Sequence, residues 1–220
     1  MAEKRYEIVH EDDSIIVIDK PSGMLVIPTP KNETNTLSDI LNRDLDARAV
    51  EANAYPCHRL DRETSGLIVY AKGKARQRLM MDEFKRRSVK KVYVAFVQGA
   101  VKGDGGTITR PIYSRNKDKS EPAVTRYRVL ERKAGFSIIE AEPVTGRTNQ
   151  IRIHLKSIGH PIVGESVYAF RKDYKLRFRR VALHARKLEF THPTTGQKMI
   201  FESPLPKDMI DFLSKTKMVN

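Results

Sequence analysis

The stretch that organises this chain is residues 58–66, His58-Arg59-Leu60-Asp61-Arg62-Glu63-Thr64-Ser65-Gly66. In it a carboxylate stands between two arginines, and a Thr-Ser-Gly turn follows. Because the two guanidinium groups favour the charged form, we expect Asp61 to stay ionised even where it is partly buried. An ionised, partly desolvated carboxylate can act as a nucleophile or a base. The alternative is a structural aspartate that caps the turn.

Short segments rich in β-branched residues flank this stretch on both sides. Their composition and the turns between them predict strands over residues 6–9, 14–18, 24–28, 67–71, 92–97, 123–130, 136–143, 181–190 and 199–201. Apolar spacing and caps predict helices over residues 37–45 behind Thr36, 74–87, 151–158 and 206–215. In the helix over residues 74–87, the expected apolar positions are Leu79, Met80 and Phe84. Residues 103–106, which are rich in glycine, predict a tight loop. Hairpin-like succession with a few helices is typical of the α+β class, here one domain over residues 1–220 with a mixed, largely antiparallel central sheet flanked by helices and loops.

Composition and charge exclude several classes of protein. The 220 residues include one cysteine, Cys57, so an internal disulfide and a cysteine-rich zinc site are excluded. The six histidines lack paired metal-ligand spacing, and neither a P-loop nor a dinucleotide fingerprint occurs, so we expect no metal and no cofactor. Apolar runs are too short to span a bilayer and no secretory signal opens the chain, which predicts a cytoplasmic protein. A net charge of +14 predicts a polyanionic partner, foremost nucleic acid.

The positive charge is concentrated in two runs. Residues 72–91 contain nine basic and two acidic residues, and residues 169–187 contain eight and one. Two such runs favour a phosphate-binding surface over the alternative of solvated helix faces. Phe170, Tyr174 and Phe178 recur at four-residue spacing in the second run, which favours an apolar helix face over a base-stacking platform.

Two further segments contain candidate site residues. Tyr93, in the alternating segment 92–97, can stack on a base or donate its hydroxyl, and the alternative is a core tyrosine. Arg147 and Arg152 lie at the two ends of a strand-to-helix entry, where a guanidinium can pair with a carboxylate or bind phosphate. The alternative is a capped helix with exposed charges.

Taken jointly, these stretches resemble the RluA family of RNA pseudouridine synthases. Residues 58–66 look like the family's H-R-L-D-x-x-T-S-G signature. Supporting blocks follow in the family's order at residues 19–26, 91–95, 146–154, 159–164 and 183–193, so the resemblance extends over about residues 6–206. The chain departs from the family pattern at Asp19, Asn149 and Glu165, where the family usually has Asn, His and Asp. The pattern starts within ten residues of Met1, so we expect a compact member without the S4-type domain of larger ones.

The resemblance implies a role for each matching residue. Asp61 would act on a flipped-out uridine, at C1′ of the ribose or at C6 of the ring, and both routes stay open. Tyr93 would stack on the base and help to remove the C5 proton. Arg152 would pair with Asp61, with Arg147 as the alternative, and Arg59 would occupy the space that the extruded nucleotide leaves. The reaction involves no redox change, which agrees with the expected lack of a cofactor.

The expected partner is RNA, as an rRNA or tRNA stem-loop. We expect the protein to be a monomer that does not associate with a membrane. The RNA contacts are expected from Arg59, Arg62, Lys85, Arg86, Arg87, Lys90 and Arg147. There are three alternatives to a synthase that acts on rRNA, tRNA or both. They are a strictly tRNA-specific synthase, a catalytically silent RNA-binding or ribosome-assembly protein, and a metal-dependent nuclease that uses Asp61.

Overall fold

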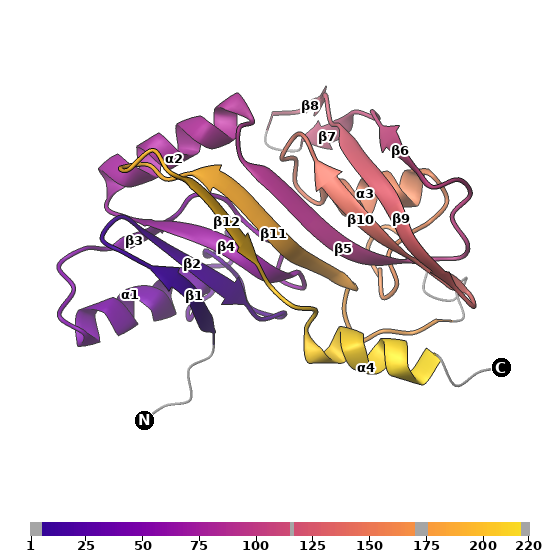
Figure 1. Cartoon of the computed structure of the whole chain (residues 1–220), viewed down its shortest axis with the longest axis horizontal. Helices are drawn as coiled ribbons and strands as arrows, with labels where there is room; N and C mark the ends of the chain where they lie inside the picture. Colours follow the sequence, from indigo (N-terminus) through magenta and orange to yellow (C-terminus); the bar gives the residue numbers. More distant parts are fainter. Residues whose placement is uncertain (1–5, 115–116, 170–175, 217–220) are drawn as a thin grey trace. The chain divides into compact units, whose positions relative to one another are not determined.

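The computed structural model describes residues 6–114, 117–169 and 176–216. The chain forms two compact units, of which the first combines residues 1–90 with 187–203 and the second combines 91–186 with 204–220. Each unit has its own strands and helices (Figure 1). The mixture of strands and helices confirms the α+β class, while the single domain over residues 1–220 stays a prediction.

The strands of the first unit form antiparallel pairs. They are β1 (Glu7–Glu11), β2 (Ile15–Lys20), β3 (Ala54–Pro56), β4 (Ser65–Lys72) and the hairpin of β11 (Leu183–Thr191), which begins in the second unit, with β12 (Lys198–Glu202). β2 lies between β1 and β4, and Ile18 stands opposite Ile68. These strands confirm the predictions made for residues 6–9, 14–18, 67–71 and 199–201.

Helices α1 (Leu37–Ala47) and α2 (Lys74–Arg86) lie on opposite sides of these strands (Figure 1). One face of the strands packs on buried Met80 of α2, through Ile15, Val17, Leu67, Val69 and Leu188. On the other face, Tyr70 Oη lies 3.1 Å from Ser38 Oγ of α1. Thr36 caps α1 as predicted, since its side chain accepts a hydrogen bond from Asp39 N in a reciprocal capping box.

Two predictions in the first unit are wrong. Residues 24–28 are not a strand, because the carbonyls of Leu25 and Val26 accept from Leu37 N and Ser38 N at the start of α1, at 2.7 and 3.1 Å. Leu79, expected on the apolar face of the second helix, is 51% exposed. Met80 and half-buried Phe84 turn toward the strands instead.

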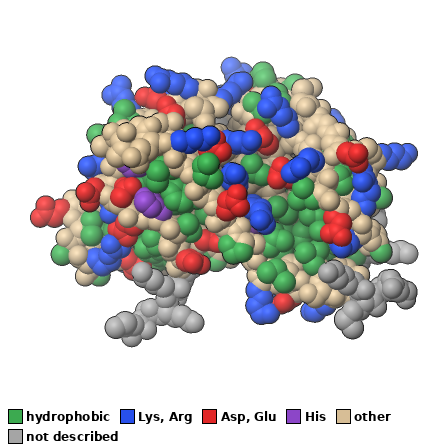
Figure 2. Space-filling view, viewed as in Figure 1, with side chains coloured by type: hydrophobic (Ala, Val, Ile, Leu, Met, Phe, Trp, Pro, Cys, Tyr) green, Lys and Arg blue, Asp and Glu red, His purple; other side chains and the backbone are tan. Residues whose placement is uncertain are grey.

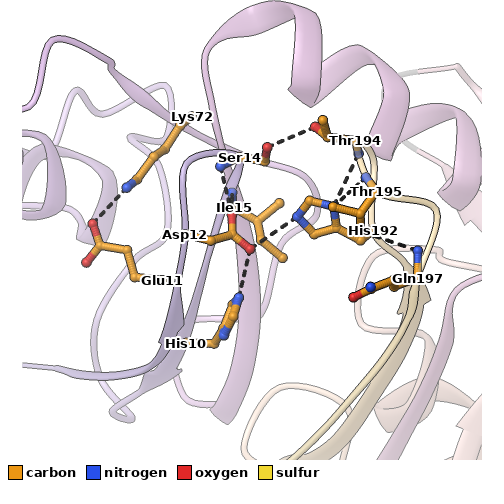
Figure 3. Close-up of polar contacts among 10 residues, drawn as sticks. All are labelled: His10, Glu11, Asp12, Ser14, Ile15, Lys72, His192, Thr194, Thr195 and Gln197. Carbon is orange, nitrogen blue, oxygen red and sulfur yellow. Dashed lines mark hydrogen bonds and ion pairs between the residues drawn. The ribbon is translucent and has the colours of Figure 1, made fainter.

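A polar cluster joins the β1–β2 turn to the β11–β12 turn (Figure 3). Asp12 Oδ2 lies 2.8 Å from His10 Nε2 and 3.1 Å from His192 Nε2. Its other oxygen accepts from the backbone N–H groups of Ser14 and Ile15. The carboxylate therefore ties together two turns that are 180 residues apart.

The second unit has a four-stranded antiparallel arrangement in the order β5-β10-β9-β6. The strands are β5 (Lys90–Gln98), β10 (Phe136–Pro143), β9 (Thr125–Lys133) and β6 (Gly105–Ile108). β7 (Ile112–Ser114) and β8 (Lys119–Glu121) form a separate hairpin. β5 is buried from Val92 onward, so both of its faces are covered.

Helices α3 (Gln150–Ser157) and α4 (Lys207–Thr216) complete the second unit and confirm the predicted helices. An aromatic cluster anchors α4, because Phe212 contacts the rings of Phe96, Phe136 and Phe178 at centroid distances of 5.9, 5.4 and 5.4 Å. The buried side chain of Arg180 adds an ion pair to the half-exposed carboxylate of Asp208 at 2.6 Å.

Two predictions in the second unit need correction. The glycine-rich segment 103–106 is partly strand, since β6 begins at Gly105, where a Cβ would lie 2.5 Å from the Tyr127 carbonyl oxygen of β9. The glycine allows this close approach of the two backbones. Phe178 lies outside any helix and packs on α4. Phe170 and Tyr174 lie outside the described residues, so the predicted apolar helix face is not described.

Candidate active site

The loop that contains residues 58–64, called the signature loop below, lies in the first unit between β3 and β4. Leu60 and Thr64 are buried and anchor the loop, Asp61 is half-buried, and Arg59 and Arg62 are exposed. The carbonyl of Asp61 accepts from Thr64 N at 3.1 Å, which closes the turn. The loop thus presents a half-buried carboxylate between two solvent-facing cations.

The backbone of this loop is held by residues 20–23. Lys20 is fully buried, and its ammonium group donates to the carbonyls of Pro21, Met24 and Arg62 at 2.9, 2.9 and 3.2 Å. Gly23 N also donates to the Arg62 carbonyl at 2.8 Å. Ser22 Oγ donates to the carbonyl of Glu63 at 2.7 Å. The two carbonyls that follow Asp61 therefore each have a donor from the same short segment.

Sequence reasoning gave no role to residues 20–23, although they belong to a block that matches the family pattern. A lysine after a strand reads as a surface charge, since lysine is almost never fully buried unless it is paired. The signal that could have revealed the role is the Lys-Pro-Ser-Gly turn, which brings a long cationic donor back over its own backbone.

His58 and Cys57 are parts of the framework beside the loop. His58 Nε2 accepts from Val69 N of β4 at 3.3 Å, and its ring lies 4.9 Å from that of Phe84 on α2. Burial raises the pKa of the Cys57 thiol to about 12, so the thiol stays protonated at neutral pH.

Tyr93 lies on β5 in the second unit, is 7% exposed and stands opposite Ala141 of β10. Lys91 lies two residues earlier, and therefore on the same face of the strand. Burial lowers the pKa of the Lys91 ammonium. A cationic group thus lies on the face of β5 that also presents the tyrosine.

Arg152 lies in the first turn of α3 and is nearly buried. Its Nε and Nη2 donate to Glu165 Oε2 and Oε1, both at 2.8 Å, and its Nη1 donates to Asn149 Oδ1 at 3.0 Å. Burial alone would raise the pKa of Glu165, but the hydrogen bonds and charge of Arg152 and the backbone donors of the next turn lower it below its usual value. The pair is therefore ionised on both sides. Two departures from the family pattern, Asn149 and Glu165, meet at this one guanidinium.

Arg147, the alternative partner that the resemblance implies for Asp61, forms contacts with other residues of the second unit. Its Nη1 lies 3.3 Å from Glu121 Oε1, and its Nε donates to the Pro122 carbonyl at 3.2 Å. Its backbone N–H donates to Gln150 Oε1 at 3.0 Å, which closes the entry to α3.

Three of the predicted RNA-binding residues of the first basic run lie at the end of α2, and the fourth, Lys90, is the first residue of β5. Lys85, Arg86, Arg87 and Lys90 are all exposed, and Lys and Arg side chains gather over α2 in Figure 2. Lys85 and Arg86 have acidic neighbours on the helix, Asp82 at 2.9 Å and Glu83 at 4.0 Å. These exposed pairs contribute little stability, so they leave the cations available to phosphate.

The second basic run is only partly described. Arg171, Lys172 and Lys175 lie outside the described residues. Arg180 is buried against Asp208 and is no surface cation. Arg177 and Arg179 are exposed.

The structure places Asp61, Arg59 and Arg62 in the first unit and Tyr93, Arg147 and Arg152 in the second. Among the described residues no cluster of three or more His, Cys, Asp or Glu side chains could hold a metal ion. In the same part of the chain, no helix is long and apolar enough to cross a bilayer.

Comparison with known proteins gives independent evidence about the family of this chain. A model of the RNA pseudouridylate synthase family matches residues 14–157. The uncharacterized RNA pseudouridine synthase YlyB of Bacillus subtilis is 36% identical over 96% of this chain and 73% of its own length. The ribosomal large subunit pseudouridine synthase D of Pseudomonas aeruginosa is 40% identical over 94% of this chain and 71% of its own. The corresponding enzyme of Neisseria meningitidis serogroup A is 38% identical, and this chain covers 61% of it.

The fold is shared with a solved structure. Human RNA pseudouridylate synthase domain containing 4 superimposes with a TM-score of 0.81 at 24% identity, covering 96% of this chain and 92% of that chain.

Proposed function

The chain belongs to the RNA pseudouridylate synthase family, a class of isomerases, and we propose that it converts uridine to pseudouridine in structured RNA with Asp61 as its catalytic carboxylate. The observation that supports this assignment is the setting of Asp61, half-buried between two exposed arginines on a loop held by buried Lys20. The arginines can bind the phosphates on either side of the target nucleotide.

The proposed reaction is an isomerisation in which atoms and electrons balance. The bond between N1 of uracil and C1′ breaks, the base rotates, and a bond between C5 and C1′ forms. The C5 proton leaves to solvent, and N1 takes up a proton. Asp61 would add at C1′ or at C6 to make the detachment possible, and no external oxidant or reductant is needed.

Three other residues would assist Asp61. Tyr93, buried on β5, would stack on the base and help to remove the C5 proton. Arg152 would pair with Asp61. Arg59, exposed on the loop, would take the place of the extruded nucleotide and offset part of the few kcal/mol that base flipping costs.

The proposed substrates are stem-loops of rRNA or tRNA. Relatives named ribosomal large subunit pseudouridine synthase D, at up to 40% identity, favour large-subunit rRNA. Transcripts of large-subunit rRNA and of total tRNA, each with tritium at C5 of uridine, separate the two. Tritium release from tRNA alone would establish the strictly tRNA-specific alternative.

The decisive variant is Asp61→Asn. We expect it to bind RNA within a few-fold of the wild type and to release no tritium. Asp46→Asn, which alters an exposed carboxylate of the same unit, is the control and keeps full activity. Normal tritium release by Asp61→Asn would refute the assignment of Asp61.

Two other outcomes with the wild-type protein would replace the proposal. RNA binding without tritium release from any RNA would mean a silent RNA-binding protein. Strand scission that depends on added Mg²⁺ would mean a nuclease.

A further inference from the structure

The guanidinium of Arg152 is held on two sides. Glu165 engages Nε and Nη2 in a fork with two 2.8 Å hydrogen bonds, and Asn149 Oδ1 accepts from Nη1 at 3.0 Å. A guanidinium has five N–H donors, so these contacts account for three of them. Three contacts from two side chains therefore fix both the plane and the rotation of the guanidinium.

The side chain of Glu165 is also held by contacts that do not involve Arg152. Its side chain is 1% exposed, and Oε1 accepts from the backbone N–H groups of Ser166, Val167 and Tyr168 at 3.0, 2.8 and 3.2 Å. On the other side, Gly164 has a φ of +87° and lies so close to Arg180 that a Cβ would be 1.8 Å from the Arg180 carbonyl oxygen. The backbone that presents the carboxylate is therefore held on both sides.

Asn149 closes the arrangement from the helix side. It has a φ of +54°, in the left-handed region where asparagine is enriched among non-glycine residues. Its Nδ2 donates to Tyr168 Oη at 2.8 Å, and the Tyr168 ring lies 5.3 Å from Arg152 Cζ. Tyr168 follows the turn that Glu165 caps, so four side chains form one closed network around the guanidinium.

We propose that Asn149 and Glu165 are positioning residues that act through Arg152, by fixing the orientation of its guanidinium. This inference rests on the proposed function, because it assigns Arg152 as the partner of Asp61. Glu165 also offsets the charge of Arg152, so that an arginine buried to this degree is stable before any substrate binds. If the guanidinium could rotate, its donors would adopt several orientations. The rate of isomerisation would then fall, because the productive orientation would be populated less of the time.

Two single substitutions test this proposal. Glu165→Gln retains an oxygen for the three backbone N–H groups but places an amide NH₂ against Arg152. Asn149→Gly suits the positive φ and removes only the side-chain contacts. For each variant we expect kcat for tritium release to fall about 10- to 100-fold, with the KM for RNA within about threefold of the wild type.

The double variant and a rescue separate positioning from a general loss of stability. Because both residues act on one guanidinium, the fall in kcat of the double variant should be smaller than the product of the two single falls. Asn149→Asp keeps an oxygen for Arg152 Nη1 and should recover more kcat than Asn149→Gly. If Glu165→Gln does not fold, Asn149→Gly and its rescue decide the question.

Asp208→Asn is a control, since it breaks the ion pair of a second buried arginine of the unit, Arg180. It should lower Tm and leave kcat within about twofold. The inference is overturned if Asn149→Gly and Glu165→Gln retain kcat, if their losses appear in KM, or if their effects multiply. A wild-type protein that releases no tritium would instead overturn the proposed function itself.

Discussion

The ammonium group of Lys20 donates to the carbonyl oxygen of Arg62, 42 residues further along the chain, at 3.2 Å. Arg62 is the residue after Asp61, so a fully buried cation supports the backbone beside the proposed catalytic carboxylate. Ser22 Oγ and Gly23 N donate further hydrogen bonds to the same loop. Residues 20–23 therefore hold the backbone of the loop in place.

Replacing Lys20 by methionine keeps most of the aliphatic stem and removes the ammonium donors. Three carbonyl oxygens then lose a charged donor, which should lower the free energy of unfolding by about 3 kcal/mol or more. Urea unfolding measures this loss, and single-turnover tritium release should show a reduced rate at temperatures where the variant is folded. Lys31→Met, at an exposed position, is the control and should change neither. Unaltered stability of Lys20→Met would show that the loop does not depend on this ammonium group.

Reversing the charges of Lys85, Arg86 and Arg87 tests the basic end of α2 as an RNA-binding surface. If these residues bind phosphates, the variant should bind RNA more weakly and with a smaller dependence of log K on log salt, by about 0.7 to 0.9 for each phosphate that the protein no longer neutralises. The value of kcat at saturating RNA should change little. The same charge change at Lys102, Lys198 and Lys207 controls for net charge. A salt dependence equal to that of the wild type would mean that this end of α2 faces only solvent.

Asp12 should make the first unit sensitive to acid. Burial would raise its pKa, but the hydrogen bonds from His10 and from the backbone of Ile15 and Ser14, with the charge of His192, lower it from 3.8 to about 2. A carboxyl with a lowered pKa in the folded state stabilises the protein above its unfolded pKa, and this contribution is lost as pH falls through the folded pKa. With a side chain that is 33% exposed, the contribution is about 1–2 kcal/mol, lost between about pH 4 and pH 2.

Asp12→Asn should therefore reduce the free energy of unfolding at neutral pH, and the difference from the wild type should shrink as the pH approaches about 2. Urea unfolding over this pH range measures the difference. Asp13→Asn, at the exposed neighbouring position, should show no such dependence. A constant difference between wild type and Asp12→Asn at every pH would contradict the prediction.

Gly164 should tolerate no side chain. It has a positive φ, and a Cβ would lie 1.8 Å from the Arg180 carbonyl oxygen. Gly159 has almost the same φ, +86° against +87°, but an added Cβ there would meet nothing within 4 Å. Gly159→Ala should thus cost about 1 kcal/mol through backbone strain alone, whereas Gly164→Ala should cost more than about 4 kcal/mol. Equal thermal stability of the two variants would show that the close approach to Arg180 is not maintained.

The pattern of residues along the chain determined most of the local structure. Strand composition, turn residues and the Thr36 cap predicted most of the strands and all four helices of the described residues, because these signals come from neighbours within a few positions. Residues 24–28 were predicted wrongly for the same reason. The amino-acid composition of an apolar extended segment is the same whether its carbonyls accept hydrogen bonds from a neighbouring strand or, as here, from the first turn of α1.

The same limit applies to the candidate site. Asp61, Tyr93 and Arg152 could be selected from the sequence because each stands in a distinctive short motif. The contacts of Lys20, Asn149 and Glu165 became visible only in the folded chain. Lys20 reaches a carbonyl 42 residues away, and Glu165 reaches a guanidinium 13 residues away. A motif states which groups are present, whereas the direction of a buried hydrogen bond depends on which backbones the fold brings within about 3 Å of each other.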